Sequence, residues 1–159
     1  MKIVLRKIMR VVLWVGGTLI ILLAAVSISI WQFAKGMCGN EVIAEYQSPG
    51  KKHRVVVFQR DCGATTGFST QASILDTDET LSNESGNVFT SDTNHGATPS
   101  GLGGGPAISV EWENDKLVVF SYHHKTRVFK QEQEMDGVHI SYDSNAQQGI
   151  PGKAPSIHP

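Results

Sequence analysis

Residues 60–71, RDCGATTGFSTQ, include the side chains of this chain that are best suited to chemistry. Cys62 could act as a nucleophile if a histidine such as His95 or His123 stabilised its thiolate, as in cysteine hydrolases. It could instead form a disulfide with Cys38, the other cysteine of the sequence. Ser69, in GFSTQ, lacks the second glycine that a nucleophile elbow requires. The pattern around Ser69 therefore indicates a strand rather than a catalytic turn.

The compartment decides between the two roles of Cys62, and an apolar segment near the N-terminus indicates that compartment. Residues 11–33 read VVLWVGGTLIILLAAVSISIWQF and contain no charge. As a helix this run would be about 34 Å long, enough to cross a hydrocarbon core of about 30 Å. A helix that is apolar on all sides needs protein around it everywhere, and the rest of the chain is too small to enclose one. We expect a membrane-spanning helix.

Basic residues set the orientation of this helix. Four of them, Lys2, Arg6, Lys7 and Arg10, precede the apolar run, and only Lys35 follows it closely. The positive-inside rule then predicts a single-pass membrane protein with a cytoplasmic N-terminus, and with the remainder periplasmic or extracellular. A cleaved signal peptide is the main alternative, with cleavage near the small residues that precede residue 30. Lipid attachment at Cys38 is disfavoured, because a charge stands three places before it.

The chain divides into four predicted parts: a basic cytoplasmic flank (1–10), the membrane helix (11–33), an exported β domain (34–144) and a disordered tail rich in proline (145–159). After Lys35, nine lysines and arginines stand against fifteen acidic residues, a net charge of −6. Phosphate backbones would repel such a domain, so the charge excludes nucleic acid as a partner. In an oxidising compartment we expect Cys38 and Cys62 to pair, with a stabilisation of roughly 3 kcal/mol.

Strands dominate the predicted exported domain. Alternating and β-branched runs predict strands at residues 41–46, 54–60, 67–75, 107–113, 116–123, 127–130 and 138–142, with a shorter one around Val88 and Phe89. The turn signals are SPGK at residues 48–51, Asn114-Asp115 and Asp136-Gly137. No long amphipathic helix competes with these strands. The predicted fold class is mainly β, an N-terminal transmembrane helix followed by a small antiparallel sheet or sandwich.

Residues 92–106, DTNHGATPSGLGGGP, are predicted to form a loop, because their glycines leave the backbone too free for an ordered strand. The glycine run fits neither dinucleotide nor phosphate-loop spacing, and DTDET at residues 76–80 departs from a calcium loop at its glycine and at its last ligand. His123 and His124 are adjacent on a predicted strand and would point to opposite faces, which is unsuitable for one metal ion. We expect no catalytic residue, metal or cofactor.

Three stretches carry a resemblance to a known group of proteins. CGNE at residues 38–41, SPGKKHRVVVFQRDCGATTGFSTQ at residues 48–71, and the later NVF, DTNHG and GGGP motifs resemble a family of small bacterial envelope proteins, some anchored by a helix and others by lipid. The similarity extends from Cys38 to about Tyr142. It implies a protein of the bacterial inner or cytoplasmic membrane with an exported, shared domain, and it implies no particular activity.

Two functional hypotheses follow. The first is a membrane-anchored, non-enzymatic envelope protein whose β domain binds another envelope protein or a delivered one, as an accessory or immunity protein would. The second is an envelope hydrolase or ligand-binding domain that uses the loop at residues 60–66 together with His95. The candidate contact residues for a ligand or partner are Arg60, Asp61, Thr65, Thr66, Asp92, Asn94 and His95.

Overall fold

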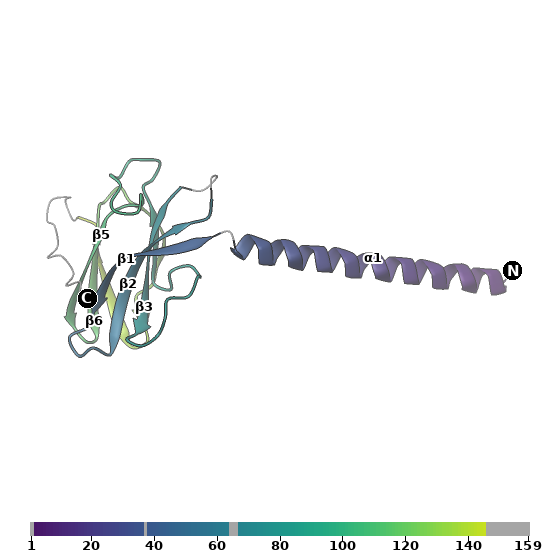
Figure 1. The fold of residues 1–159 in the computed structure, drawn as a ribbon, viewed down its shortest axis with the longest axis horizontal. Helices are drawn as coiled ribbons and strands as arrows, with labels where there is room; N and C mark the ends of the chain where they lie inside the picture. The colour runs from purple at the N-terminus through teal and green to yellow at the C-terminus, as the bar shows by residue number, and fades with distance from the viewer. Residues whose placement is uncertain (1, 37, 64–66, 146–159) are drawn as a thin grey trace. The chain divides into compact units, whose positions relative to one another are not determined.

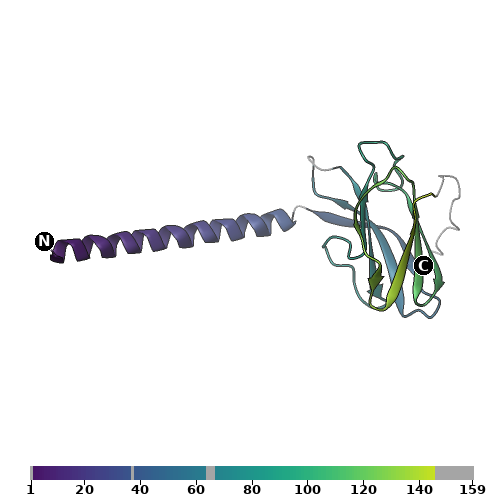
Figure 2. The same ribbon diagram turned by 180° about the vertical axis from the view of Figure 1, so that it is seen from behind.

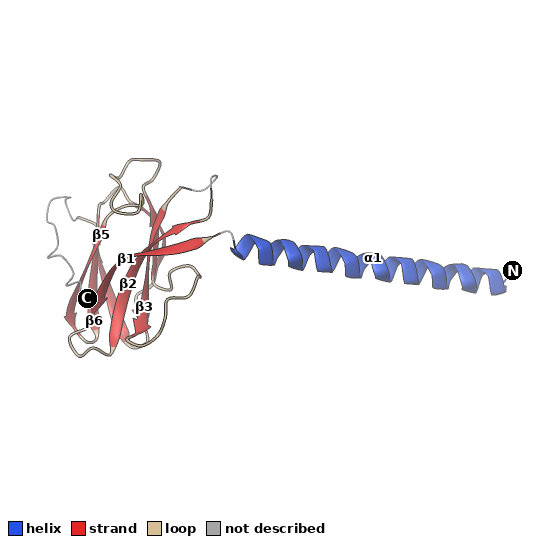
Figure 3. Ribbon diagram, in the orientation of Figure 1, coloured by secondary structure: helices blue, strands red, loops and turns tan. Residues whose placement is uncertain are grey.

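The structure, a computed structural model, describes residues 2–36, 38–63 and 67–145. The chain divides into two compact units, Met1–Met37 and Cys38–Pro159. Among the residues just given, helix occurs in the first unit and strands occur in the second, as Figure 3 shows by colour. The predicted fold class, mainly β with an N-terminal apolar helix, is confirmed.

Helix α1 (Lys2–Gly36) includes a stretch, Val12–Gln32, that is long and apolar enough to cross a membrane, and none of that stretch is buried. Its few hydroxyl groups bond back to the helix: Ser27 Oγ donates to the Leu23 carbonyl at 2.8 Å and Ser29 Oγ to the Ala25 carbonyl at 2.9 Å. Such bonds satisfy polar side chains where no water is available. The helix also continues through the basic residues that were predicted to form a separate flank.

Two sheets make up the second unit (Figure 1). The first has the strand order β1-β2-β3-β4-β7 and the second has the order β5-β6-β9-β8. All neighbouring pairs are antiparallel except β6 and β9, which are parallel. The strands are β1 (Gly39–Gln47), β2 (His53–Asp61), β3 (Ser69–Asp76), β4 (Phe89–Asp92), β5 (Ile108–Asn114), β6 (Leu117–Tyr122), β7 (Arg127–Gln131), β8 (Glu134–Met135) and β9 (Val138–Asp143).

The main core lies between the sheets, where alternate residues of both contribute apolar side chains. Phe89 is at its centre, with its ring centroid 5.9 Å from that of Phe120 and 5.3 Å from that of Tyr122. The domain is therefore a β-sandwich. The buried members of this core are Val55, Val57, Ala72, Ile74, Val88, Phe89, Val110, Val118, Phe120, Tyr122, Val138 and Ile140.

A second, smaller core lies on the outer face of the first sheet. The chain between β3 and β4, residues 77–88, which we call the covering loop, contributes Leu81 to a cluster with Val56, Phe58 and Leu75. Val56 and Phe58 are completely buried there. For β3 the sequence predicted alternation between a buried and an exposed face. The covering loop changes this, because the outward residues Gln71 and Ser73 are also buried.

The turn between β5 and β6 and the order of the glycine-rich segment differ from the predictions. The β5–β6 turn is formed by Asp115 and Lys116, one residue later than expected, because β5 bulges before Asn114 pairs with Leu117. The glycine-rich segment lies outside the strands, as predicted, but its backbone is held in place. The Gly101 amide donates to the Gly105 carbonyl at 2.7 Å, and a Cβ on Gly105 would lie 2.4 Å from Thr70 Oγ1. Close packing therefore requires glycine at residue 105.

Candidate functional site

The candidate residues gather at one end of the first sheet, where β2 ends and β3 begins. Strand register places Arg60 opposite Ser69, Ser69 opposite Asp92, and Asp92 opposite Arg127. Residues directly opposite one another project from the same face. These four side chains form one polar row on the outer face, and the two ends of the row bond to different parts of the chain.

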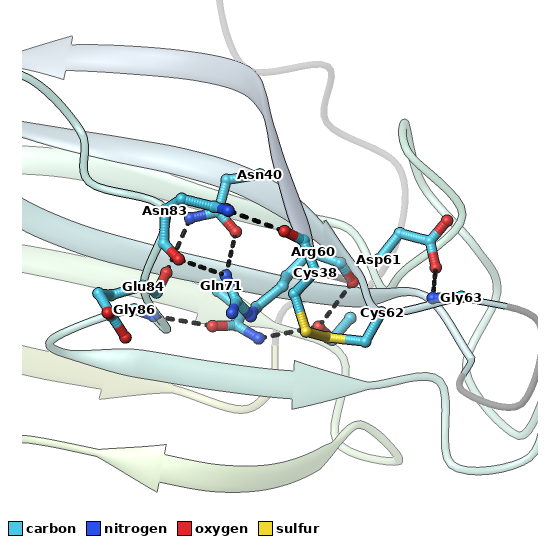
Figure 4. Close-up of a disulfide and its surroundings, with 11 residues drawn as sticks. Cys38, Asn40, Arg60, Asp61, Cys62, Gly63, Gln71, Asn83, Glu84 and Gly86 are labelled. Atoms are coloured by element: carbon cyan, nitrogen blue, oxygen red, sulfur yellow. Dashed lines mark hydrogen bonds between the residues drawn. A yellow bond between two sulfur atoms is a disulfide. The ribbon is translucent and has the colours of Figure 1, made fainter. Parts of the chain in front are cut away.

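The disulfide between Cys38 and Cys62 closes this end of the sheet (Figure 4). It joins the residue before β1 to the residue after β2, beside the paired residues Gly39 and Asp61, and spans 24 positions of sequence. The predicted pairing is thus present. A sulfur held in a disulfide is not a thiolate, so in this state Cys62 is no nucleophile.

Arg60 fastens the covering loop to the sheet (Figure 4). Its Nη1 donates to Asn40 Oδ1 at 2.6 Å and to the Asn83 carbonyl at 3.4 Å. Asn40 Nδ2 in turn donates to the Ser82 and Glu84 carbonyls, at 3.0 and 2.7 Å. Asn40, which accepts a hydrogen bond from Arg60, thus holds residues 82 and 84 against β1, and Arg60 adds a long bond to residue 83.

Neighbouring polar groups complete this attachment. Asn83 Nδ2 donates to the carbonyl of Cys38 at 2.8 Å, which brings the covering loop to the disulfide. The buried side chain of Gln71 accepts a hydrogen bond from the Gly86 amide at 2.8 Å, and its Nε2 donates to Ser69 Oγ at 2.9 Å. The Ser69 hydroxyl donates to the Arg60 carbonyl at 3.2 Å. Ser69 is therefore part of the hydrogen bonding within the sheet.

Asp61 shapes the turn that follows β2. Its Oδ1 accepts a hydrogen bond from the Gly63 amide at 2.9 Å, and Gly63 has a φ of 98°, which favours glycine. The two threonines of the predicted set, Thr65 and Thr66, lie outside the described residues.

Asp92 pairs with Arg127 at the other end of the polar row. Arg127 Nε donates to Asp92 Oδ1 at 3.0 Å, and its Nη2 pairs with Oδ2. Partial burial alone would raise the pKa of Asp92, but the hydrogen bonds from Arg127 and from the Asn94 backbone outweigh it and lower this pKa. The carboxylate is thus stabilised in its charged form.

His95 reaches the same arginine. Its Nε2 lies 3.3 Å from Arg127 Nη1, and the guanidinium carbon of Arg127 lies 5.0 Å from the ring centroid of Phe129. Asn94 and His95 have φ values of 50° and 55°, in the left-handed region that few residues other than glycine adopt. This tight turn directs His95 toward β7, whereas Arg60 bonds toward β1.

The prediction for His123 and His124 was wrong. Strand β6 ends at Tyr122, and the Thr126 amide donates to the His123 carbonyl at 2.9 Å, so both histidines lie in a turn. The two rings lie beside each other, with their centroids 4.3 Å apart, and do not point to opposite faces of a strand. Desolvation and the neighbouring His124 and Lys125 lower the pKa of His123. Among the residues that the structure describes, no group of three or more His, Cys, Asp or Glu could hold a metal ion.

An open depression of about 450 Å³ lies elsewhere on the domain. None of the candidate residues lines it. Tyr142, on its wall, donates to the Glu132 carbonyl at 2.6 Å, and burial is the first cause that raises the pKa of this phenol. The lining residues are Gln131, Gln133, His139, Ile140, Ser141 and Tyr142.

Comparisons of the chain with protein-family models, with curated proteins and with solved structures find no match. Functional arguments therefore depend on the chain's own residues. Sequence reasoning missed Arg127, Asn40 and Asn83, which bond to the candidate residues. Arg127 stood at the start of a predicted strand, but no local pattern relates it to Asp92, 35 residues earlier.

Proposed function

We propose that this protein is a membrane-anchored envelope protein whose exported β-sandwich binds another protein rather than catalysing a reaction. The observation that carries the proposal is the engagement of the candidate residues. The Cys62 sulfur is in a disulfide, Arg60 holds the covering loop, and Asp92 and His95 contact Arg127. Among the described candidates, Cys62, Ser69 and His95 each have a partner within the fold.

Two features support the proposal that the sandwich lies outside the cytoplasm. Helix α1 contains an unburied apolar stretch of 21 residues, and an apolar surface of that length requires a membrane or a targeting machinery. Disulfides persist in oxidising compartments and are rare in the cytosol. The basic residues before the helix favour a cytoplasmic N-terminus and an exported sandwich.

A hydrolase would require the two candidate loops to act on one substrate. Arg60 bonds toward β1 and the covering loop, while His95 contacts Arg127 on β7, so the two side chains serve different neighbours. Ser69, between them in the row, hydrogen bonds to the Arg60 carbonyl and to Gln71. These contacts favour a binding role over a nucleophile and base pair.

The test is purification of the full chain from its native envelope after chemical crosslinking, followed by affinity measurements with the partner that is recovered. His95→Ala and Ser69→Ala should each leave the partner affinity within about tenfold, or about 1.4 kcal/mol, because neither group performs chemistry. Both variants are first checked for folding by near-ultraviolet circular dichroism. A loss of several hundredfold in a folded His95→Ala variant would instead indicate direct ligand contact or catalysis by this histidine.

A further inference from the structure

The outer faces of the two sheets are unlike. The covering loop lies over the outer face of the first sheet, where Val56 and Phe58 are completely buried. The outward residues of the second sheet stay exposed or half-exposed. Figure 2, the view from behind Figure 1, shows β9 of this sheet in yellow-green. We call the outward residues of β5, β6, β8 and β9 the open face.

Register defines the open face. Its two central rows consist of Ser109, Ser121 and Asp143, and of Glu111, Val119 and Ser141. A third row contains Leu117, His139 and Glu134. The middle of the face thus carries serine and valine side chains, which are short. Short side chains on a sheet form a flat surface. Shape complementarity with such a surface requires a partner that is also flat.

Carboxylates dominate the charge of the open face, and one of them, Glu134, has its Oε2 3.6 Å from His139 Nδ1. Glu111, Glu134 and Asp143 lie on it, and Glu113 is at the bulge of β5. None of the four strands contains a lysine or an arginine. Glu111 and Glu113 on the edge strand β5 would also deter edge-to-edge pairing, and Asp143 has a paired strand, β6, on one side, because β8 pairs only with Val138 and His139.

We propose that the open face is the surface through which the sandwich binds a protein partner, and that the partner presents a flat basic surface rich in lysine and arginine. This inference rests on the proposed binding function and names its surface and the chemistry of its partner. Charge complementarity selects a basic partner, and the same carboxylates would repel nucleic acid or an anionic lipid surface. Half-buried Val119 supplies apolar area in a central row of the contact, and half-buried Leu117 supplies more in the third row.

The experiment is site-specific photocrosslinking of the full-length protein in its native envelope. p-Benzoylphenylalanine replaces Ser121 or Ser141 on the open face, and Thr80 of the covering loop as the control position. We expect the first two to crosslink to one protein, whose attached peptide is rich in lysine and arginine, and we expect no such product from residue 80. Crosslinks that form only within the chain, or to an acidic peptide, would overturn the proposal.

Charge-reversal variants provide a second test of the proposal. Glu111→Lys with Glu134→Lys should lower the crosslinking yield at Ser141 by at least about tenfold, since four units of charge change against a basic partner. Asp78→Lys with Glu79→Lys makes the same change on the covering loop and should leave the yield within about twofold. An equal effect of the two pairs would overturn the proposal. A partner recovered by chemical crosslinking that never attaches to the open face would refute this inference and leave the proposed function standing, whereas recovery of no partner would refute both.

Discussion

Polar side chains at the disulfide end of the sandwich hold segments of the chain together. Arg60 donates to the Asn83 carbonyl, Asp61 accepts a hydrogen bond from the Gly63 amide, and Asp92 pairs with Arg127. Each of these residues looked functional in the sequence because charged and small polar side chains cluster there. Their contacts show that such a cluster can arise from the need to satisfy loop backbone groups.

Replacing Cys62 tests the contribution of the disulfide. Cys62→Ser should lower the free energy of unfolding by about 2–4 kcal/mol, because the bridge restricts the unfolded chain over its 24-residue separation. Denaturant melts in oxidising buffer measure the change. The double variant Cys38→Ser with Cys62→Ser is the matched control, since it leaves no free thiol. Equal midpoints for the parent and both variants would show that the bridge contributes nothing.

The pairing of Asp92 with Arg127 predicts a dependence of stability on pH. The pKa of Asp92 is lowered in the folded state, so the unfolded chain binds more protons in acid. The stabilisation is complete above the unfolded pKa, about 4, and is lost as the pH falls through the lower folded pKa. Asp92→Asn should therefore lose less stability than the parent between pH 4 and pH 2.5, as measured by urea midpoints.

Arg127→Gln is the companion to this variant, because it removes the donor and leaves the carboxyl group in place. It should flatten the acid limb of the stability curve in the same way. A parent and two variants with parallel curves would mean that the pair does not affect folding.

At the scale of elements, β2 and β3 are unusual because both of their faces are covered. The sandwich core buries their inward residues, and the covering loop buries Val56 and Phe58 on the other side. The backbone of the covering loop comes very close to the backbone of β3 at one residue. Gly86 occupies that point, and its amide donates to Gln71.

Gly86→Ala tests this close approach. An added Cβ would lie 2.6 Å from the Phe89 carbonyl oxygen and 2.7 Å from that of Ala72, both backbone atoms that cannot move aside cheaply. We expect a loss of about 1–3 kcal/mol of stability in denaturant melts. Gly67→Ala is the control, because nothing lies within 4 Å of its Cβ position, and it should change stability by less than about 0.5 kcal/mol. Similar losses for the two variants would contradict the packing of the covering loop.

At the scale of the whole molecule, the prediction concerns topology. Reporter enzymes fused after Gly36 should be active only outside the cytoplasm, because the basic residues precede the apolar stretch Val12–Gln32. The mature protein should keep its N-terminal helix, which intact-mass spectrometry of the purified protein can measure. A mature chain that begins near Ser29 would identify the helix as a cleaved signal and would leave export of the sandwich intact.

The sequence by itself determined the helix, most of the strands and the disulfide. An uninterrupted apolar run has one stable environment, alternation reports the two faces of a strand, and two cysteines in an oxidising compartment have only each other as partners within the chain. These are local or compositional signals. They did not place Arg60 near Asp92, because only the register of β2, β3 and β4 brings these two residues to the same end of the sheet.

Tertiary structure alone decided how the strands divide into two sheets, why β6 and β9 run parallel, and which outer face is covered. Alternation of apolar and polar residues indicates that one face of a strand is buried, but not which segment covers it. The burial of Gln71 by residues that follow β3 could therefore not be predicted. The pairing of Asp92 with Arg127 joins positions 35 apart through register between β4 and β7. Contacts of this kind depend on chain folding that brings distant strands together, and no spacing in the sequence encodes them.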